Sequence, residues 1–463
     1  MKSNTFSMAL CGKPGSISPT RIIVVSFCAV ILTGTVLLML PISTRDGGIS
    51  FVDALFTATS ATCVTGLVVF DTFTKFTAFG QAVLLLLIQI GGLGLVTLTA
   101  FFNVALHKRM GFKSMKLASE SISLDEATGA KPLLYTVMRT SMGFELAGAL
   151  LLMVVMVPKF GIDGIWISVF TAVSAFCNAG FDIFGRIAPY TSLATFYSNG
   201  YVLVIVMVLI ISGGLGFIVW QDLFMFRRRR KLSLHAKLAV AVTVTLIAVG
   251  ALVIGLLEWQ NPATMGSFST GEKVLSSLFQ SVTCRTAGFN TIDQASMHTV
   301  SKLASVALMF IGACPGGTGG GIKGTTAIIL FFTILSVLQG RGEAVIRGRR
   351  IDKKTVYRAL AIVTLGLMVV LITALVMTFD TPQAKGLVDD NFIDCLFEAT
   401  SAFGTVGLTD GVTAKLSAVG KISGVLAMLI GRVGPIAMGM SLATRAGELS
   451  RREILPEAKI VVG

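Results

Sequence analysis

Long apolar runs recur along the whole chain and are separated by short polar loops. Eight of them are long enough for an α-helix to cross roughly 30 Å of hydrocarbon, which takes about 20 residues. We expect outer helices at 21–41, 133–157, 236–258 and 356–379, and inner helices at 76–102, 199–226, 302–338 and 420–445. The pattern predicts an all-α polytopic membrane protein with eight transmembrane helices.

A shorter apolar segment lies between the outer and the inner helix of each pair. In each copy about 12 apolar residues precede a glycine, too few to span a bilayer but enough for a re-entrant half-helix. A Ser or Thr lies shortly before this glycine. The segments are 51–67, 166–181, 274–289 and 392–408, and their glycines are Gly66, Gly180, Gly288 and Gly407. The third copy is shifted by one residue, because Phe279 lies nine positions before its glycine where the other copies have ten.

These units predict four helix–pore loop–helix repeats around a central pore. The repeats are 1–106, 107–226, 227–340 and 341–463, the last with a C-terminal tail. Irregular backbone inside a membrane is tolerated only where it is buried in protein or lines a water-filled path. Four broken segments are therefore expected to surround such a path.

The strand after each half-helix is the candidate cation-selectivity filter. A half-helix points the negative end of its dipole at the path, and carbonyl oxygens of an extended strand can replace the hydration shell of a cation. One glycine alone is better explained by close helix packing, but four at near-equal intervals favour a filter. The candidate filter residues are Val64, Thr65, Gly66, Asn178, Ala179, Gly180, Thr286, Ala287, Gly288, Thr405, Val406 and Gly407.

Composition and charge exclude two other classes of protein. Hydrophobic residues make up 54% of the chain and charged residues 13%, which excludes a water-soluble domain. The net charge of +14 comes from basic runs between apolar spans, such as 227–231 and 347–350, as the positive-inside rule describes, and no folded basic domain for nucleic acid is present. We expect both termini in the cytoplasm and a mildly acidic pore mouth facing outward from the cell membrane.

No enzyme active site is expected. The seven cysteines are scattered, and His107, His235 and His298 lie in different regions, whereas a membrane enzyme needs clustered His, Asp or Cys. We therefore expect no covalent cofactor.

Residues 312–326 interrupt the third inner helix with seven glycines and a proline. Neither residue type favours a helix, so a loop at membrane depth is expected in the cavity below the filter. Gly319, Gly321 and Gly324 match a GxGxxG spacing, but without a βαβ context this pattern does not indicate nucleotide binding.

Three ionisable residues stand at membrane depth, where such groups are costly and usually functional. Lys323 in the loop and Arg432 in the fourth inner helix could repel cations below the filter, or could instead snorkel or pair with Glu398 or a helix C-terminus. Glu145 could pair with Arg139, relay ions or face a partner helix, and the sequence leaves these alternatives open.

The motifs TCVTGL at 62–67, FCNAGF at 176–181, CRTAGFN at 284–290 and FGTVGLT at 403–409 resemble the Trk/Ktr/HKT superfamily of K⁺ transporters. The likeness covers essentially the whole chain and is greatest to the bacterial Ktr membrane subunit, since one outer helix precedes the first pore segment. It implies K⁺ uptake through a filter whose carbonyls bind K⁺. Na⁺ is a possible second ion. Whether transport is channel-like or coupled to Na⁺ stays undecided.

The resemblance also implies a gate and partners. The expected gate is the intramembrane loop together with the arginine below the filter, namely Gly312, Pro315, Gly316, Gly317, Thr318, Gly319, Gly320, Gly321, Lys323 and Arg432. The expected partners are a second copy of the chain, membrane lipid and a cytosolic ring of nucleotide-binding, KtrA-like regulatory subunits. The loops 107–131 and 227–237 and the tail after Pro456 are the candidate contact surfaces.

A secondary transporter of a small solute is the competing interpretation. Such proteins use broken helices and inverted repeats. Here all four predicted repeats enter and leave from the same side, which argues against inversion.

Overall fold

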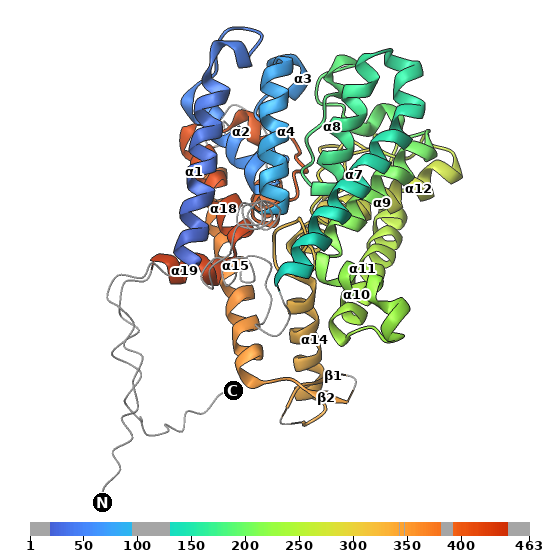
Figure 1. The fold of residues 1–463 in the computed structure, drawn as a ribbon, viewed down its shortest axis with the longest axis vertical. Helices are drawn as coiled ribbons and strands as arrows, with labels where there is room; N and C mark the ends of the chain where they lie inside the picture. Colours follow the sequence, from blue (N-terminus) through green and yellow to red (C-terminus); the bar gives the residue numbers. More distant parts are fainter. Residues whose placement is uncertain (1–18, 95–129, 342, 347, 381–391, 443–463) are drawn as a thin grey trace, which may run out of the picture.

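The computed structural model describes residues 19–94, 130–341, 343–346, 348–380 and 392–442. Apart from one short hairpin, the described elements are helices packed side by side (Figure 1). The mostly helical character predicted from the sequence is confirmed.

Four helices are long and apolar enough to cross a membrane on their own, or five spans if a bent pair counts as one, among the residues that the structure describes. They are α1 (Pro19–Met39), α7 (Ala130–Phe160), α11 (Leu234–Glu258) and α15 (Lys353–Asp380). Each exposes large apolar side chains, including Val36, Val154 and Leu256, which are more than half exposed. Such continuous apolar faces suit lipid contact.

Four shorter helices lie between the long ones and the inner helices. They are α2 (Phe51–Cys63), α8 (Asp163–Cys177), α12 (Thr270–Thr283) and α16 (Phe392–Gly404). Two of them begin at a hydroxyl cap, because Ser50 accepts from the backbone N–H of Asp53 and Ser269 forms a capping box with Glu272. All four end before the glycine of their segment.

The inner helices differ from the sequence-based prediction. They are α4 (Ala78–Leu93), α9 (Gly200–Gly214) with α10 (Phe217–Arg229), α13 (Thr299–Phe310) with α14 (Gly324–Leu338), and α18 (Ala418–Val433) with α19 (Pro435–Leu442). The expectation of continuous second and fourth inner helices is wrong. The bend between α9 and the first turns of α10 is 96°.

A glycine in the left-handed region explains these breaks. Gly94, Gly216 and Gly434 have φ of 80°, 91° and 97°, with ψ between 128° and 143°. This backbone conformation suits glycine and cannot continue a right-handed helix. Residues 95–102 and 443–445 of the predicted inner helices lie outside the described residues.

The remaining elements are short. They are η1 (Pro41–Ser43), α3 (Thr72–Lys75), η2 (Phe184–Arg186), η3 (Ser192–Phe196), α17 (Val412–Lys415) and the antiparallel pair β1 (Val345–Ile346) and β2 (Arg349–Arg350). Figure 1 shows α14, the two strands and the start of α15 reaching beyond the other helices at the end opposite to α3.

The helices close into a ring in one rotational sense. Helix α4 packs against α8, α9 against α12, α13 against α16, and α18 returns to α2. The inner helix of each repeat therefore contacts the half-helix of the next repeat. An ion pair joins the last contact, with 2.7 Å between Lys421 Nζ on α18 and Asp53 Oδ1 on α2.

This ion pair is expected to stabilise the closed ring. Both side chains are mostly buried, at 13% and 15% exposed, so Lys421→Ala leaves a carboxylate without its cation and should lower the free energy of unfolding by about 1–3 kcal/mol. Thermal unfolding of the purified protein in detergent, with the double-mutant cycle on Asp53→Ala, measures the coupling.

The pair Lys75–Asp46 provides the matched control. Its Nζ–Oδ2 distance is 2.6 Å, but the aspartate side chain is 63% exposed. Disrupting this exposed pair should lower the free energy of unfolding by about 0–1 kcal/mol. Equal losses for the two pairs would contradict a special role for the α18–α2 contact.

Candidate functional site

The four glycine segments have one backbone conformation. Gly66, Gly180, Gly288 and Gly407 all have positive φ, at 95°, 69°, 80° and 92°. The residue two positions before each glycine is also left-handed, with φ of 59° at Val64, 61° at Asn178, 68° at Thr286 and 51° at Thr405. Non-glycine residues hold this conformation only where the surroundings impose it, and such strain is concentrated at functional sites.

The four glycines approach one another in a closed cycle. A methyl group built on Gly66 would lie 2.5 Å from the carbonyl oxygen of Ala179, one on Gly180 would lie 2.9 Å from that of Ala287, and one on Gly288 would lie 2.6 Å from that of Val406. A methyl group on Gly407 would meet the carbonyl oxygen of Thr65 and close the cycle. We call this arrangement the glycine ring.

Hydroxyl groups of the half-helices hold the ring. Gly66 N donates to Ser60 Oγ over 3.1 Å and Gly407 N to Ser401 Oγ over 3.0 Å. In the other two segments the hydroxyl donates to the carbonyl after the glycine, from Ser174 Oγ to Phe181 and from Thr283 Oγ1 to Phe289, each over 2.6 Å. Thr283 lies five positions before its glycine and the serines six, so the one-residue shift of the third copy is a structural feature.

An acidic cavity of about 290 Å³ lies on one side of the ring, and we call it the vestibule. Its lining includes all four glycines together with Asp71, Asp182, Asp293 and Asp410, one aspartate from each repeat. Asp182 lies in the loop outside the helices, where burial and then the nearby Asp71 carboxylate raise its pKa to about 6. Among the described residues the lining includes no lysine or arginine, so the ionised aspartates make the cavity attractive to cations.

The loop between α13 and α14 lies against the opposite side of the ring. Gly320 N donates to Thr405 Oγ1 over 2.8 Å, and the Asn178 amide lies between the hydroxyls of Thr286 (3.2 Å) and Thr318 (3.3 Å). Of the four left-handed residues of the ring, Asn178 and Thr405 contact this loop directly, and Thr286 is linked to it through Asn178. A cation passing through the ring would meet the loop next.

Arg432 and Lys323 are two of the cationic side chains that contact this loop. Arg432 donates to the carbonyl oxygen of Thr318 in the loop and to those of Gly91 and Gly92 at the end of α4. Lys323 donates to Gly319 O over 2.7 Å. Arg432 therefore contacts both the loop and a helix C-terminus, that of α4, which is one of the alternatives considered for it. Glu398, the other alternative partner, instead accepts hydrogen bonds from Thr409 and Thr413.

The half-buried Glu145 and the buried Arg285 also have hydrogen-bond partners. Glu145 accepts from Gln89 Nε2 at 3.0 Å and 3.2 Å, so the structure connects it to α4. Arg285 is 6% exposed, and its Nη2 donates to the carbonyl of Gly312, where the loop begins, over 3.3 Å. No three His, Cys, Asp or Glu side chains form a metal-binding group within the described residues.

Residues 12–446 match the model of the TrkH family, which is described as a cation transport protein. The chain belongs to this family. The resemblance predicted from the four motifs is thereby confirmed, and this TrkH-family protein is a cation transporter and not an enzyme.

Individual relatives cover nearly the whole transporter. It is 39% identical to the potassium/sodium uptake protein NtpJ of Enterococcus hirae, over 96% of this chain and 98% of that protein. It is 40% identical to the Ktr system potassium uptake protein B of Bacillus subtilis, over 92% and 93% of the two chains. The crystal structure of the potassium transporter TrkH from Vibrio parahaemolyticus has the same fold, with a TM-score of 0.69, 18% identity, and coverage of 94% and 86%.

The sequence interpretation of this TrkH-family chain predicted an acidic pore mouth, but it singled out neither the individual vestibule aspartates nor the partners of Glu398. A signal was present, since an aspartate follows each ring glycine by two to five residues. Most of loop 107–131 and the tail after Pro456 lie outside the described residues.

Gly407→Ala in this transporter should disrupt the ring and lower cation flux by at least about tenfold, which corresponds to roughly 1.4 kcal/mol. The reason is steric, because the new methyl group would meet Thr65 O and lie 2.9 Å from the Cα of Gly66. Gly411→Ala is the matched control, with φ of 94° and nothing within 4 Å of the added carbon. Cation flux into proteoliposomes and the melting temperature measure both effects, and equal losses of flux would refute the steric argument.

Proposed function

We propose that this protein takes up K⁺ across the cytoplasmic membrane through the glycine ring, which acts as a selectivity filter. The observation that supports this most directly is the closed cycle, in which each glycine Cα faces the carbonyl of the next segment. Only such close approach places carbonyl oxygens of four separate segments around one axis. The printed names of the relatives, which specify potassium or potassium and sodium, identify K⁺ as the ion to test first.

In the proposed filter, backbone carbonyls replace the hydration shell of K⁺. The oxygens of Thr65, Ala179, Ala287 and Val406 are the central candidates, because each lies beside the next glycine. Val64, Asn178, Thr286 and Thr405 would supply carbonyls closer to the loop. The four half-helices end at these strands, so their negative dipole ends favour a cation there.

The proposed topology has eight spans and four re-entrant half-helices, with both termini in the cytoplasm. The basic runs between repeats support this orientation. The vestibule then opens to the outside, where its aspartates raise the local concentration of cations. Na⁺ remains a second candidate ion.

The loop that includes Gly312, Pro315, Gly316, Gly317, Thr318, Gly319, Gly320, Gly321 and Lys323 is the proposed gate, with Arg432 as its latch. Its contacts with Asn178, Thr405 and the α9–α10 break support a blocked pathway in this conformation. Lys323 adds a positive charge where a cation would leave the filter. Movement of the loop would remove both the plug and the charge.

We further propose a homodimer that binds a cytosolic ring of KtrA-like regulatory subunits, as the name of the relative from the Ktr system suggests. Residues 227–237 connect α10 and α11 on the side of the loop. Together with loop 107–131 and the C-terminal tail they are the candidate contact surface. The exposed apolar faces of the long helices are available to lipid or a second copy.

Inverted-repeat secondary transport fits the fold less well. Inverted repeats are related by an axis in the membrane plane. In this chain the repeat-to-repeat contacts follow one another in a single rotational sense around one axis. The broken inner helices, which the two architectures share, do not discriminate between them.

Expression in a bacterium that lacks its own K⁺ uptake tests the proposed function. The protein, together with the regulatory subunit, should restore growth at low K⁺, and Gly288→Ser should raise the K⁺ concentration for half-maximal uptake at least about tenfold. The added side chain would meet the Val406 carbonyl at 2.6 Å. Growth that is restored by Na⁺ and not by K⁺ would reject K⁺ as the substrate.

Arg432→Gln tests the gate. The variant loses the positive charge and weakens the latch on Thr318, so proteoliposomes without regulatory subunit should show K⁺ flux several-fold above wild type. Lys237→Ala removes a positive charge from the exposed side of α11 and should leave flux unchanged. Lower flux in Arg432→Gln, with an unchanged melting temperature, would show that the arginine supports conduction and does not block it.

A further inference from the structure

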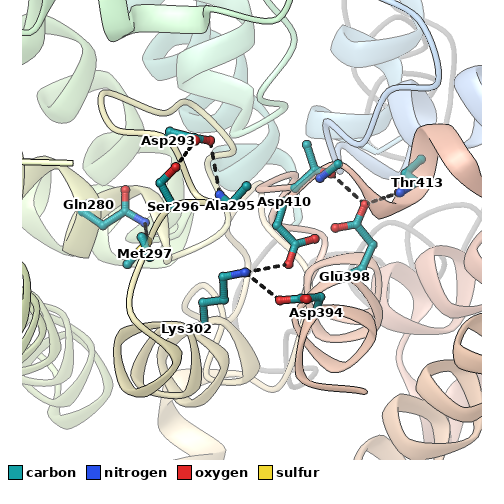
Figure 2. A network of polar contacts seen from close by, with 12 residues as sticks. Gln280, Asp293, Ala295, Ser296, Met297, Lys302, Asp394, Glu398, Asp410 and Thr413 are labelled. Carbon is teal, nitrogen blue, oxygen red and sulfur yellow. Dashed lines mark hydrogen bonds and ion pairs between the residues drawn. The ribbon is translucent and has the colours of Figure 1, made fainter. Parts of the chain in front are cut away.

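Two buried carboxylates lie beside the vestibule, behind the fourth glycine segment. Asp410 follows Gly407 by three residues, and Glu398 comes from α16. The Glu398 side chain is fully buried and that of Asp410 is 2% exposed. Figure 2 shows one oxygen of each carboxylate turned toward the other carboxylate.

Three hydrogen-bond donors converge on one oxygen of Glu398. Its Oε1 accepts from Thr409 Oγ1 at 2.8 Å, from Thr413 N at 2.9 Å, and from Thr413 Oγ1. A carboxylate oxygen that accepts several donors is stabilised as the anion. Its Oε2, however, has no hydrogen-bond partner among the described residues.

Asp410 has the complementary arrangement. Its Oδ2 lies 3.4 Å from Lys302 Nζ, while its buried Oδ1 has no hydrogen-bond partner in the described part of the chain. Lys302 is also 2.6 Å from Asp394 Oδ1, so one ammonium group serves two aspartates (Figure 2). Glu398, on the other side of Asp410 from Lys302, adds a third carboxylate to this cluster.

This excess of buried negative charge requires compensation. Burial and the neighbouring Glu398 raise the pKa of Asp410, as expected when two carboxylates share a site without a cation. Either a proton or a cation can therefore occupy the space between the two free oxygens. The position favours a cation, because Asp410 and Thr409 also line the acidic vestibule, where negative charge raises the local concentration of cations.

We propose that Glu398 Oε2 and Asp410 Oδ1 bind a small monovalent cation of the Na⁺ class at a site separate from the glycine ring. Full carboxylate charges make a stronger field than filter carbonyls and favour the smaller, harder ion. A divalent ion fits less well, because the described residues contain no group of three or more His, Cys, Asp or Glu side chains arranged to hold a metal ion. The third carboxylate of the cluster, Asp394, pairs with Lys302 instead.

The site is positioned to act on the filter. Thr409 and Thr413, the donors to Glu398, lie in the stretch that continues directly from Gly407. A cation between the carboxylates would remove their repulsion and fix this stretch. This consequence for transport rests on the proposed function, whereas the binding itself does not.

Thermal unfolding of the full-length protein in detergent tests the binding. NaCl should raise the melting temperature above that in choline chloride at equal ionic strength and fixed KCl. Asp410→Asn and Glu398→Gln should each increase the Na⁺ concentration for half-maximal stabilisation at least tenfold. Asp46→Asn, which alters a surface carboxylate that also pairs with a lysine, should retain the wild-type response.

Two results would overturn the site. One is an unchanged Na⁺ response in both carboxylate variants. The other is a melting temperature of the wild type that depends on pH and not on Na⁺, which would mean that a shared proton occupies the pair. If Glu398→Gln does not fold, the site is tested with Asp410→Asn and by measuring the binding of ²²Na⁺ to the wild type. Absence of saturable ²²Na⁺ binding contradicts the proposal.

The test is separable from that of the proposed function. Na⁺-dependent stabilisation in a protein that fails to take up K⁺ would support the site and reject K⁺ transport. K⁺ uptake with neither the uptake nor the melting temperature depending on Na⁺ would support K⁺ transport and reject the Na⁺ site.

Discussion

The close approach of four glycine backbones is the constraint on which the rest of the structure depends. A single methyl group at any of these positions would lie within 3 Å of a carbonyl on the next segment. The half-helices must therefore stop before the axis, and the strands after them must turn through left-handed residues. The contact of each inner helix with the next half-helix brings the segments to this distance and closes the ring.

Such a ring leaves backbone groups buried, and each must find a partner. The pore-helix hydroxyls meet this need in two ways. In the first and fourth segments serine accepts from the glycine N–H, and in the second and third a hydroxyl donates to the carbonyl after the glycine. The ring is therefore cyclic without being fourfold symmetric, and the amide of Asn178 connects the second and third segments to the loop.

The sequence predicted the parts of this arrangement that repeat along the chain. The four glycines, their apolar half-helices and the shift at Phe279 are local patterns, and each has a structural counterpart. The breaks at Gly216 and Gly434 were missed because apolarity alone was used to extend the inner helices. A signal existed, since GGLG at 91–94, GGLG at 213–216 and GRVG at 431–434 occupy equivalent places. Contacts such as Lys302 with Asp410, 108 residues apart, depend on the closed ring and leave no local pattern.

The breaks also explain why the loop between α13 and α14 lies where it does. A helix that ends inside the protein leaves carbonyl oxygens without helical donors. At the end of α9 the loop supplies them, from Cys314 N to Gly214 O at 3.0 Å and from Thr318 N to Gly213 O at 3.2 Å, while Phe217 N donates back to Gly316 O. At the end of α4 Arg432 supplies the donors and binds Thr318 as well. The loop thus replaces hydrogen bonds that the inner helices lack. Displacing it would expose these carbonyls, so any open state has to admit water or provide new donors beneath the ring.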